Sequence, residues 1–147
     1  MFINKNKTYI EKIKPKTKWY IINAKDQNLG RLSSQIAYMI KGKNSIFYLP
    51  YQESNTSIIV INSKYIKLTG NKQKEKIYKM HSGHPGGLKI NTLNNIQKKM
   101  PNKIIEHAVK GMLPKNTLGR KLFKNLKVYS GNRHPHSAQK PIHLTIN

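Results

Sequence analysis

The chain has 147 residues, and its 28 lysines and arginines against 5 acidic residues give a formal charge of +23. This length predicts one domain with a hydrophobic core. Like charges at this density destabilise a compact state, and a polyanionic partner would neutralise them. The chain has no cysteine, which excludes disulfides and thiolate metal sites, and it has no apolar run of about 18 residues that would span a bilayer. The composition favours a nucleic-acid partner and predicts no membrane span.

Hydrophobic spacing predicts alternating strands and helices along most of the chain. The continuous apolar run at 58–61 is typical of a strand that is covered on both faces in a parallel sheet. Gly42 is expected to cap the helix before it. Strands are expected at 19–23, 58–61, 64–69, 76–80 and 126–129, and helices at 29–41, 93–100, 101–112 and 118–124. The alternation predicts an α/β fold, a three-layer α/β domain with a small, mostly parallel sheet.

The remaining segments lack hydrophobic periodicity. The glycine- and proline-containing loop HSGHPGG at 81–87 lets backbone approach a ligand closely. We expect a basic N-terminal arm at 1–18, a core domain at 19–130 and a C-terminal extension at 131–147. Two interpretations of the arm stay open, because it is either a disordered tail or a segment that orders on a phosphate surface.

Cations recur in clusters, whereas a solvated protein face normally intersperses both signs. The clusters are Lys41 and Lys43; Lys72, Lys74, Lys76 and Lys79; Lys110 and Lys115; and Arg120, Lys121, Lys124, Lys127 and Arg133. Arg31 falls in the first turn of the helix expected at 29–41, where it either points away or meets an anion beside free N–H groups. The chain has no RRM, KH or zinc-finger signature, so we expect recognition of folded RNA through its phosphates and shape.

Histidines form two close pairs, His81 with His84 and His134 with His136. A metal site normally adds thiolate or carboxylate ligands, and this chain offers no cysteine and only scattered acids. We therefore favour imidazoles that donate hydrogen bonds to phosphate or stack on bases, with a metal site as the alternative.

Enzymatic motifs are not found in the sequence. The acids are too scattered for a catalytic carboxylate pair, and neither Ser82 nor Ser130 lies in a G-x-S-x-G motif. The turn NAKDQNLGRL has one glycine and does not match G-x-G-x-x-G. We expect no catalytic activity, no metal, no cofactor and no small-molecule substrate.

Five longer motifs follow one another between residues 19 and 141. They are WYIINA (19–24), LGRLSSQIA (29–37), IVINSKYIKLTGNK (59–72), KIYKMHSGHPGGLK (76–89) and VKGMLPKNTLGRKLFKNLKVYSGNRHPHSAQKP (109–141). With these motifs the chain resembles the family of ribosomal large-subunit protein thirteen, in its bacterial and organellar form.

The resemblance implies a non-enzymatic constituent of the large ribosomal subunit that assembles early, holds ribosomal RNA segments together and touches neighbouring ribosomal proteins. It also implies a four-stranded, largely parallel sheet, and a location on ribosomes of the bacterial cytoplasm, a plastid or a mitochondrion. From the motif match and the cation clusters, RNA contacts are expected at Arg31, Lys41, Lys43, Lys72, Lys74, Lys76, His81, His84, Gly86, Gly87, Lys89, Lys110, Lys115, Arg120, Lys121, Lys124, Lys127, Arg133, His134 and His136. Chemistry suggests their roles: cations bind phosphates, histidines donate hydrogen bonds, and glycines allow close approach.

The chain departs from the family pattern in three places. Family members often carry an acid near the end of the first strand, where this chain has Asn23. Many carry Gly-Asp before the second strand, where this chain has Asn-Thr-Ser at 55–57, and the first 16 residues have no clear match. Two other functions remain as alternatives, namely a histidine-dependent hydrolase or metal enzyme and a general polyanion-binding protein.

Overall fold

The computed structural model describes residues 17–46 and 48–145 and has the predicted α/β architecture. The strands are β1 (Lys18–Asn23), β2 (Thr56–Ile61), β3 (Ile77–His81), β4 (Leu88–Thr92), β5 (Leu126–Val128) and β6 (Ile142–Leu144). The helices are α1 (Leu29–Ile40), α2 (Lys72–Glu75), α3 (Leu93–Lys99), α4 (Asn102–Met112) and α5 (Thr117–Phe123), with short 3₁₀ helices η1 (Ser63–Tyr65) and η2 (Ser137–Gln139). Most of the expected arm at 1–18 lies outside the described residues.

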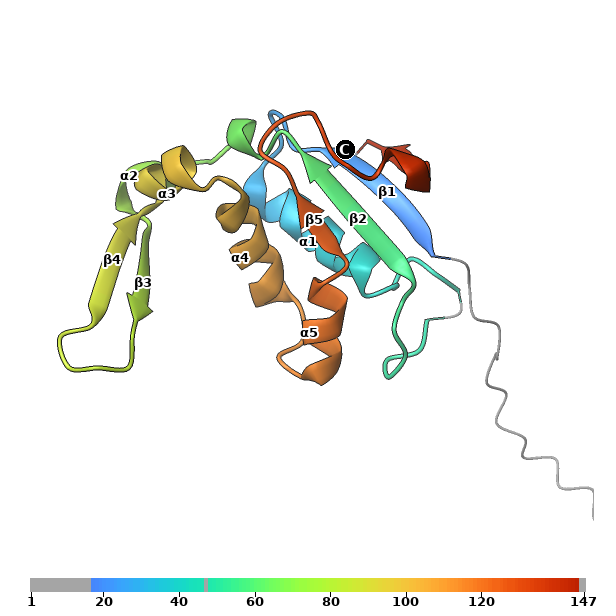
Figure 1. Cartoon of the computed structure of the whole chain (residues 1–147), viewed down its shortest axis with the longest axis horizontal. Coiled ribbons are helices and arrows are strands. Elements are labelled where there is room, and N and C mark those ends of the chain that lie inside the picture. The colour runs from blue at the N-terminus through green and yellow to red at the C-terminus, as the bar shows by residue number, and fades with distance from the viewer. Residues whose placement is uncertain (1–16, 47, 146–147) are drawn as a thin grey trace, which may run out of the picture.

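Four strands form one parallel sheet in the order β5-β2-β1-β6 (Figure 1). β1 and β2 lie side by side and are joined through α1, as the βαβ pattern predicts. Ile21 pairs with Ile59 and Ile22 with Val60, so the register aligns the apolar runs of the two strands. The predicted small parallel sheet is confirmed.

The two faces of this sheet are covered differently. One face packs against α1, α4 and α5 in the main core, and its strand residues are Ile22, Ile58, Val60 and Leu126. The opposite face buries Ile21, Ile59 and Ile61. Trp19 and Tyr129 pack on this second face. Both of their rings contact the ring of His136, which directly precedes η2, so the segment after Tyr129 lies over this face. The outer layer on that side is therefore a loop with one short helical turn.

The end of α1 follows the cap that the sequence predicts. Gly42 has φ +79°, and its N–H donates to the Met39 carbonyl at 2.9 Å, while the N–H of Lys43 donates to the Tyr38 carbonyl at 3.2 Å. This pair of bonds is a Schellman motif, which needs a residue with positive φ after the C-cap. The motif turns the chain away from α1 into the irregular segment before β2.

A close backbone contact joins the loop after α4 to α5. The side-chain oxygen of Asn116 accepts a hydrogen bond from the Gly119 N–H at 2.7 Å and caps α5. A Cβ at Gly119 would lie 1.8 Å from the Pro114 carbonyl oxygen, so only glycine fits there. These contacts hold the first turn of α5 against the end of α4.

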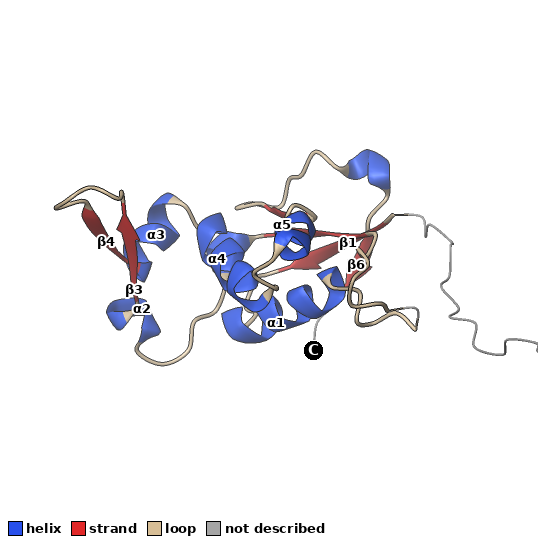
Figure 2. Cartoon of the chain, turned by 90° about the horizontal axis from the view of Figure 1, so that it is seen from below, coloured by secondary structure: helices blue, strands red, loops and turns tan. Residues whose placement is uncertain are grey.

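A second, smaller sheet projects from the domain. β3 and β4 form an antiparallel hairpin whose base adjoins α2 and α3. Figures 1 and 2 both show this hairpin standing apart from the four-stranded sheet, on the far side of α4. Almost all of its side chains are exposed.

Two expectations for secondary structure were wrong, and two elements were not expected. The segment 64–69, expected as a strand, forms η1 and then a single β-bridge between Lys67 and Asn28. The strand at 126–129 is not the last one, since β6 follows it within the supposedly irregular tail. The helix α2 and the strand β4 were not expected from the sequence, whereas β3 was expected to within one residue.

Candidate nucleic-acid interface

The predicted cations lie at the surface of several elements. Lys41 and Lys127 are half-buried, and the exposed ones are Arg31, Lys43, Lys72, Lys74, Lys76, Lys89, Lys110, Lys115, Arg120, Lys121, Lys124 and Arg133. Arg31 and Lys41 lie at opposite ends of α1, and the cations of α2 and the hairpin lie beyond α4 (Figure 1). A hollow at the α4–α5 junction is lined by three of these cations, Lys110, Lys115 and Arg120. The structure thus displays a dispersed basic surface with a local concentration of cations at this junction.

Acidic side chains neutralise little of this surface. Within residues 17–46 and 48–145 there is one ion pair, between Lys121 Nζ and Glu53 Oε1 at 3.1 Å. Both side chains are exposed, and exposed pairs contribute only about 0–1 kcal/mol. The positive charge of the described surface therefore remains available to an external anion.

The tip of the hairpin is a tight loop that displays backbone and histidines. Gly83 and Gly86 have φ +92° and +73°, where side chains other than glycine are strained. A Cβ at Gly87 would lie 2.0 Å from Ser82 Oγ, so the loop closes on itself. His81 Nδ1 accepts a hydrogen bond from the Gly83 N–H at 3.0 Å. In the neutral ring this places the proton on Nε2, as a phosphate donor requires.

His134 and His136 take part in contacts within the protein. The His136 Nε2 atom lies 2.8 Å from the Tyr129 hydroxyl, and the His136 ring lies 5.3 Å from the Trp19 ring. The His134 ring is stacked at 6.5 Å from His136, and its Nδ1 accepts a hydrogen bond from the His136 N–H. Both histidines are half-buried. This geometry gives His136 a packing role, and RNA contact by either ring stays a prediction.

An aromatic contact ties the hairpin to the main domain. The Tyr78 ring on β3 meets the His107 ring of α4 edge-on, with centroids 5.1 Å apart, and Lys76 Nζ lies 5.4 Å from the centroid of Tyr78. Burial raises the pKa of the Tyr78 hydroxyl, because the charged form would lose hydration there. The contact positions the base of the hairpin relative to α4.

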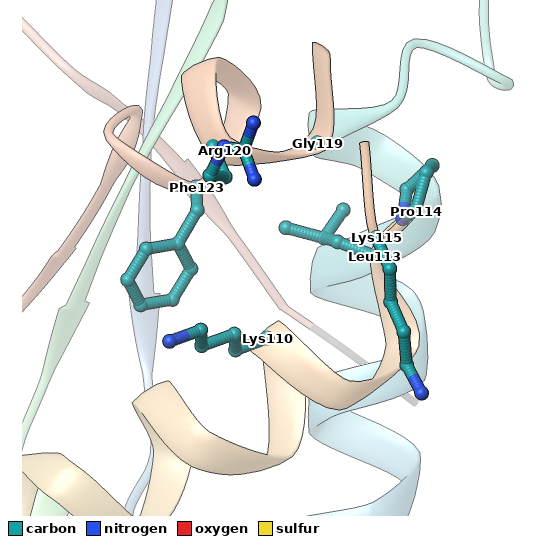
Figure 3. Close-up of a pocket in the computed structure, with 7 residues that line it drawn as sticks. All are labelled: Lys110, Leu113, Pro114, Lys115, Gly119, Arg120 and Phe123. Atoms are coloured by element: carbon teal, nitrogen blue, oxygen red, sulfur yellow. The ribbon is translucent and has the colours of Figure 1, made fainter. Parts of the chain in front are cut away.

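A pocket of about 360 Å³ lies at the α4–α5 junction (Figure 3). Leu113, Pro114 and Phe123 supply its apolar walls, and its cations are Lys110, Lys115 and Arg120. Figure 3 shows Leu113 pointing into the hollow, Lys110 extending toward the side of Phe123, and Lys115 pointing away from the centre. The pocket joins an apolar surface to a cationic rim.

Some residues of this surface were not expected to be functional. Leu113 and Phe123 are not among the RNA contacts expected from the sequence, and their position in a pocket depends on how α5 folds back on α4. Three hairpin residues on one face were also missed, because β4 was not predicted; they are Ile77, Leu88 and Ile90, which are 46%, 52% and 54% exposed. The apolar alternation on both sides of the glycine-rich loop is the signal that would have indicated them.

Clusters of metal ligands and membrane-spanning helices are both absent from the part of the chain that the structure describes. In residues 17–46 and 48–145, no group of three histidine, aspartate or glutamate side chains is arranged to hold a metal ion. None of the helices in the same ranges has the length and apolar character needed to cross a bilayer.

Comparison with known proteins decides the family. The family model for ribosomal protein L13 matches residues 17–135. The chain belongs to the ribosomal protein L13 family. It is 56% identical over 129 residues to the large ribosomal subunit protein uL13 of Thermosynechococcus vestitus, covering 88% of this chain and 85% of the relative. It is 53% identical over 141 residues to uL13c of Gracilaria tenuistipitata var. liui, covering 96% and 99%, and 52% identical over 136 residues to uL13c of Pyropia yezoensis, covering 92% and 96%.

The L13 match confirms the resemblance read from the motifs. The matched range contains β1 to β5, the hairpin and the α4–α5 pocket, and β6 lies beyond it. Asn23, one of the departures from the family pattern named from the sequence, accepts hydrogen bonds through Oδ1 from the Lys25 N–H and from Asn62 Nδ2, both at 3.0 Å. Since a carboxylate oxygen can accept the same two bonds, this departure preserves the local geometry.

Proposed function

We propose that the chain is a structural constituent of the large ribosomal subunit, which binds and organises large-subunit ribosomal RNA early in assembly. Membership of the L13 family supports this role. The observation that carries the RNA-binding part is the basic surface, which has one exposed ion pair among the described residues despite a chain charge of +23. Phosphates would supply the missing negative charge, and counterion release would favour binding.

RNA is bound through phosphates and shape. Dispersed lysines contact the backbone on several sides of the domain, and the tight loop at the hairpin tip brings its N–H groups and histidines close to the RNA. The residues proposed for these contacts are the RNA contacts expected from the sequence, of which Arg31 is the first and His136 the last. These contacts position the chain on folded RNA, and none of them belongs to a motif that reads bases.

Neighbouring ribosomal proteins are the second class of partner. On the exposed hairpin, the side chains of Ile77, Leu88 and Ile90 lie on one face. Lys79 and His81 lie on the same face, because Lys79 pairs with Ile90 and His81 with Leu88. The three exposed aliphatic side chains suit contact with another protein, and the two polar side chains among them can bind an anion beside that contact.

The chain resides on the ribosome, in the bacterial cytoplasm or in an organelle, and performs no catalysis. Relatives from bacteria and plastids support this location. In the test, large subunits are purified from the source organism and washed with moderate salt, and the chain is sought by mass spectrometry. We expect it in the washed subunits at one copy per particle. Recovery only in the free protein pool would contradict the proposal.

Two rival functions have their own tests. Stoichiometric zinc or manganese in the purified protein, lost in His81→Ala, would favour a metal enzyme. Non-cooperative unfolding in urea would favour a general polyanion binder without a specific core, whereas the buried residues of the main core predict a cooperative transition.

A further inference from the structure

The pocket at the α4–α5 junction combines two surfaces that seldom serve the same ligand. Its apolar part comes from Leu113, which is only 5% exposed, and from half-buried Pro114 and Phe123. Its cations, Lys110 and Arg120 among them, are exposed, and no acid belongs to its lining. The ligand therefore needs an apolar body and a negative charge.

Simple ligands use only half of this site. A phosphate of intact duplex RNA would meet the cations and leave the wall formed by Leu113 and Phe123 without a partner. An aliphatic side chain of another protein would fill the hollow but would gain nothing from three cations. A nucleotide has both parts, since its base is a flat apolar surface and its phosphate is anionic.

The size and rigidity of the pocket suit such a ligand. Its volume of about 360 Å³ falls in the range of about 300–1,000 Å³ that is typical of small-molecule sites. The contact between Gly119 and the Pro114 carbonyl and the Asn116 cap fix the position of α5 against α4. The hollow is thus formed before any ligand binds.

We propose that this pocket receives one unstacked nucleotide of ribosomal RNA. The base lies against the Phe123 ring and Leu113, and its phosphates lie beside Lys110 and Arg120. The inference rests on the proposed binding of large-subunit RNA and adds a defined site where one base leaves its stack. It predicts that recognition is not limited to phosphates and shape.

The test uses the full chain bound to the large-subunit ribosomal RNA of its bacterial relative. The complex is irradiated with short-wavelength ultraviolet light, which joins an aromatic side chain to a base stacked on it, and the product is mapped by mass spectrometry after trypsin digestion. We expect a single nucleotide attached to the tryptic peptide Leu122–Lys124, at Phe123. Absence of a cross-link there, in a complex that binds RNA normally, would overturn the nucleotide site and leave the proposed function intact.

Variants at Phe123 provide a second readout. Phe123→Leu keeps an apolar side chain but removes the ring, and should lower RNA affinity by roughly 5- to 150-fold, the range for loss of one stacked base. Phe123→Tyr keeps the ring and should retain the cross-link. Tyr65→Leu, which removes an exposed ring from η1 far from the pocket lining, is the matched control and should bind as the unchanged chain does.

The outcomes separate the pocket from the general function. Because Phe123 also packs on the main core, the Tm of each variant is measured, and the cross-link in the unchanged chain does not depend on any variant. Affinity that falls in Lys110→Ala and Arg120→Ala but not in Phe123→Leu would assign phosphates alone to this pocket and overturn the proposal. No binding of the RNA by the unchanged chain would refute the proposed function itself.

Discussion

The Tyr129 hydroxyl lies 2.8 Å from the Nε2 atom of His136. Tyr129 packs on the second face of the sheet, and His136 precedes η2, so this bond holds the C-terminal segment over that face. The Trp19 ring, 5.3 Å from His136, adds a contact from β1. The segment then continues into β6, which pairs with β1.

His136→Ala should destabilise the folded chain. It removes the bond to Tyr129 and the ring contact with Trp19, and we expect the free energy of unfolding in urea to fall by about 1–3 kcal/mol. Amide hydrogen exchange should rise in β6 more than in α1. His84→Ala, at the exposed hairpin tip, is the comparison and should weaken RNA binding while leaving stability unchanged. Equal stability of the two variants would contradict the packing role of His136.

Two glycines near the pocket should respond oppositely to alanine. In Gly119→Ala the new Cβ would overlap the Pro114 carbonyl oxygen, and overpacking of this kind costs about 1–3 kcal/mol. Gly111→Ala has open space and a helical position in α4, so its free energy of unfolding should stay the same or rise by up to about 1 kcal/mol. Thermal unfolding of both variants measures the difference. A stable Gly119→Ala variant would show that α5 is not fixed against Pro114.

The sequence predicted the elements whose stability depends on local spacing or on burial. The helix α1 combines apolar residues at helical spacing with Gly42, whose cap the structure contains. The strand β2 contains the continuous apolar run at 58–61, and nearly all of the strand is buried. In these segments local preference and tertiary packing favour the same structure.

Elements that depend on a distant partner were missed. The strand β6 has three residues and forms because the edge of β1 is free to pair with it. Just before the segment 64–69, Asn62 has φ +60° and turns the chain into η1. The alternating residues that follow therefore have no neighbouring strand to pair with along their length. The same limit applies to the predicted site. The charge pattern of the sequence identified the cations, but the proximity of Phe123 and Leu113 depends on tertiary packing and was not predicted.

Asn23 should tolerate an acid better than an apolar residue. Asn23→Asp keeps an oxygen that accepts the bonds from Lys25 and Asn62, and its unfolding transition should match that of the unchanged chain. Asn23→Leu leaves both donors without this acceptor and should cost about 1 kcal/mol. Urea denaturation at neutral pH distinguishes the two variants. If Asn23→Asp proves the less stable of the two, the hydrogen bonds do not explain this position.

The hairpin loop should depend on its backbone more than on a single charge. Gly86 has φ +73°, a conformation that strains a β-branched residue, so Gly86→Val should disturb the loop although space around it is open. Lys89→Ala removes only one cation from β4. We expect Gly86→Val to reduce incorporation into large subunits more than Lys89→Ala, measured by competition with the unchanged chain during assembly. Equal effects would show that close backbone approach does not matter here.

Neutralisation of the basic surface by RNA is tested most directly by the salt dependence of binding. The full chain is titrated with a large-subunit ribosomal RNA transcript at salt concentrations from about 50 to 200 mM. If about 6–10 phosphates are contacted, the affinity should fall by roughly 10³–10⁵ across this range. An affinity that stays constant with salt, or no binding to the transcript at all, would contradict the claim that RNA phosphates neutralise the basic surface of this protein.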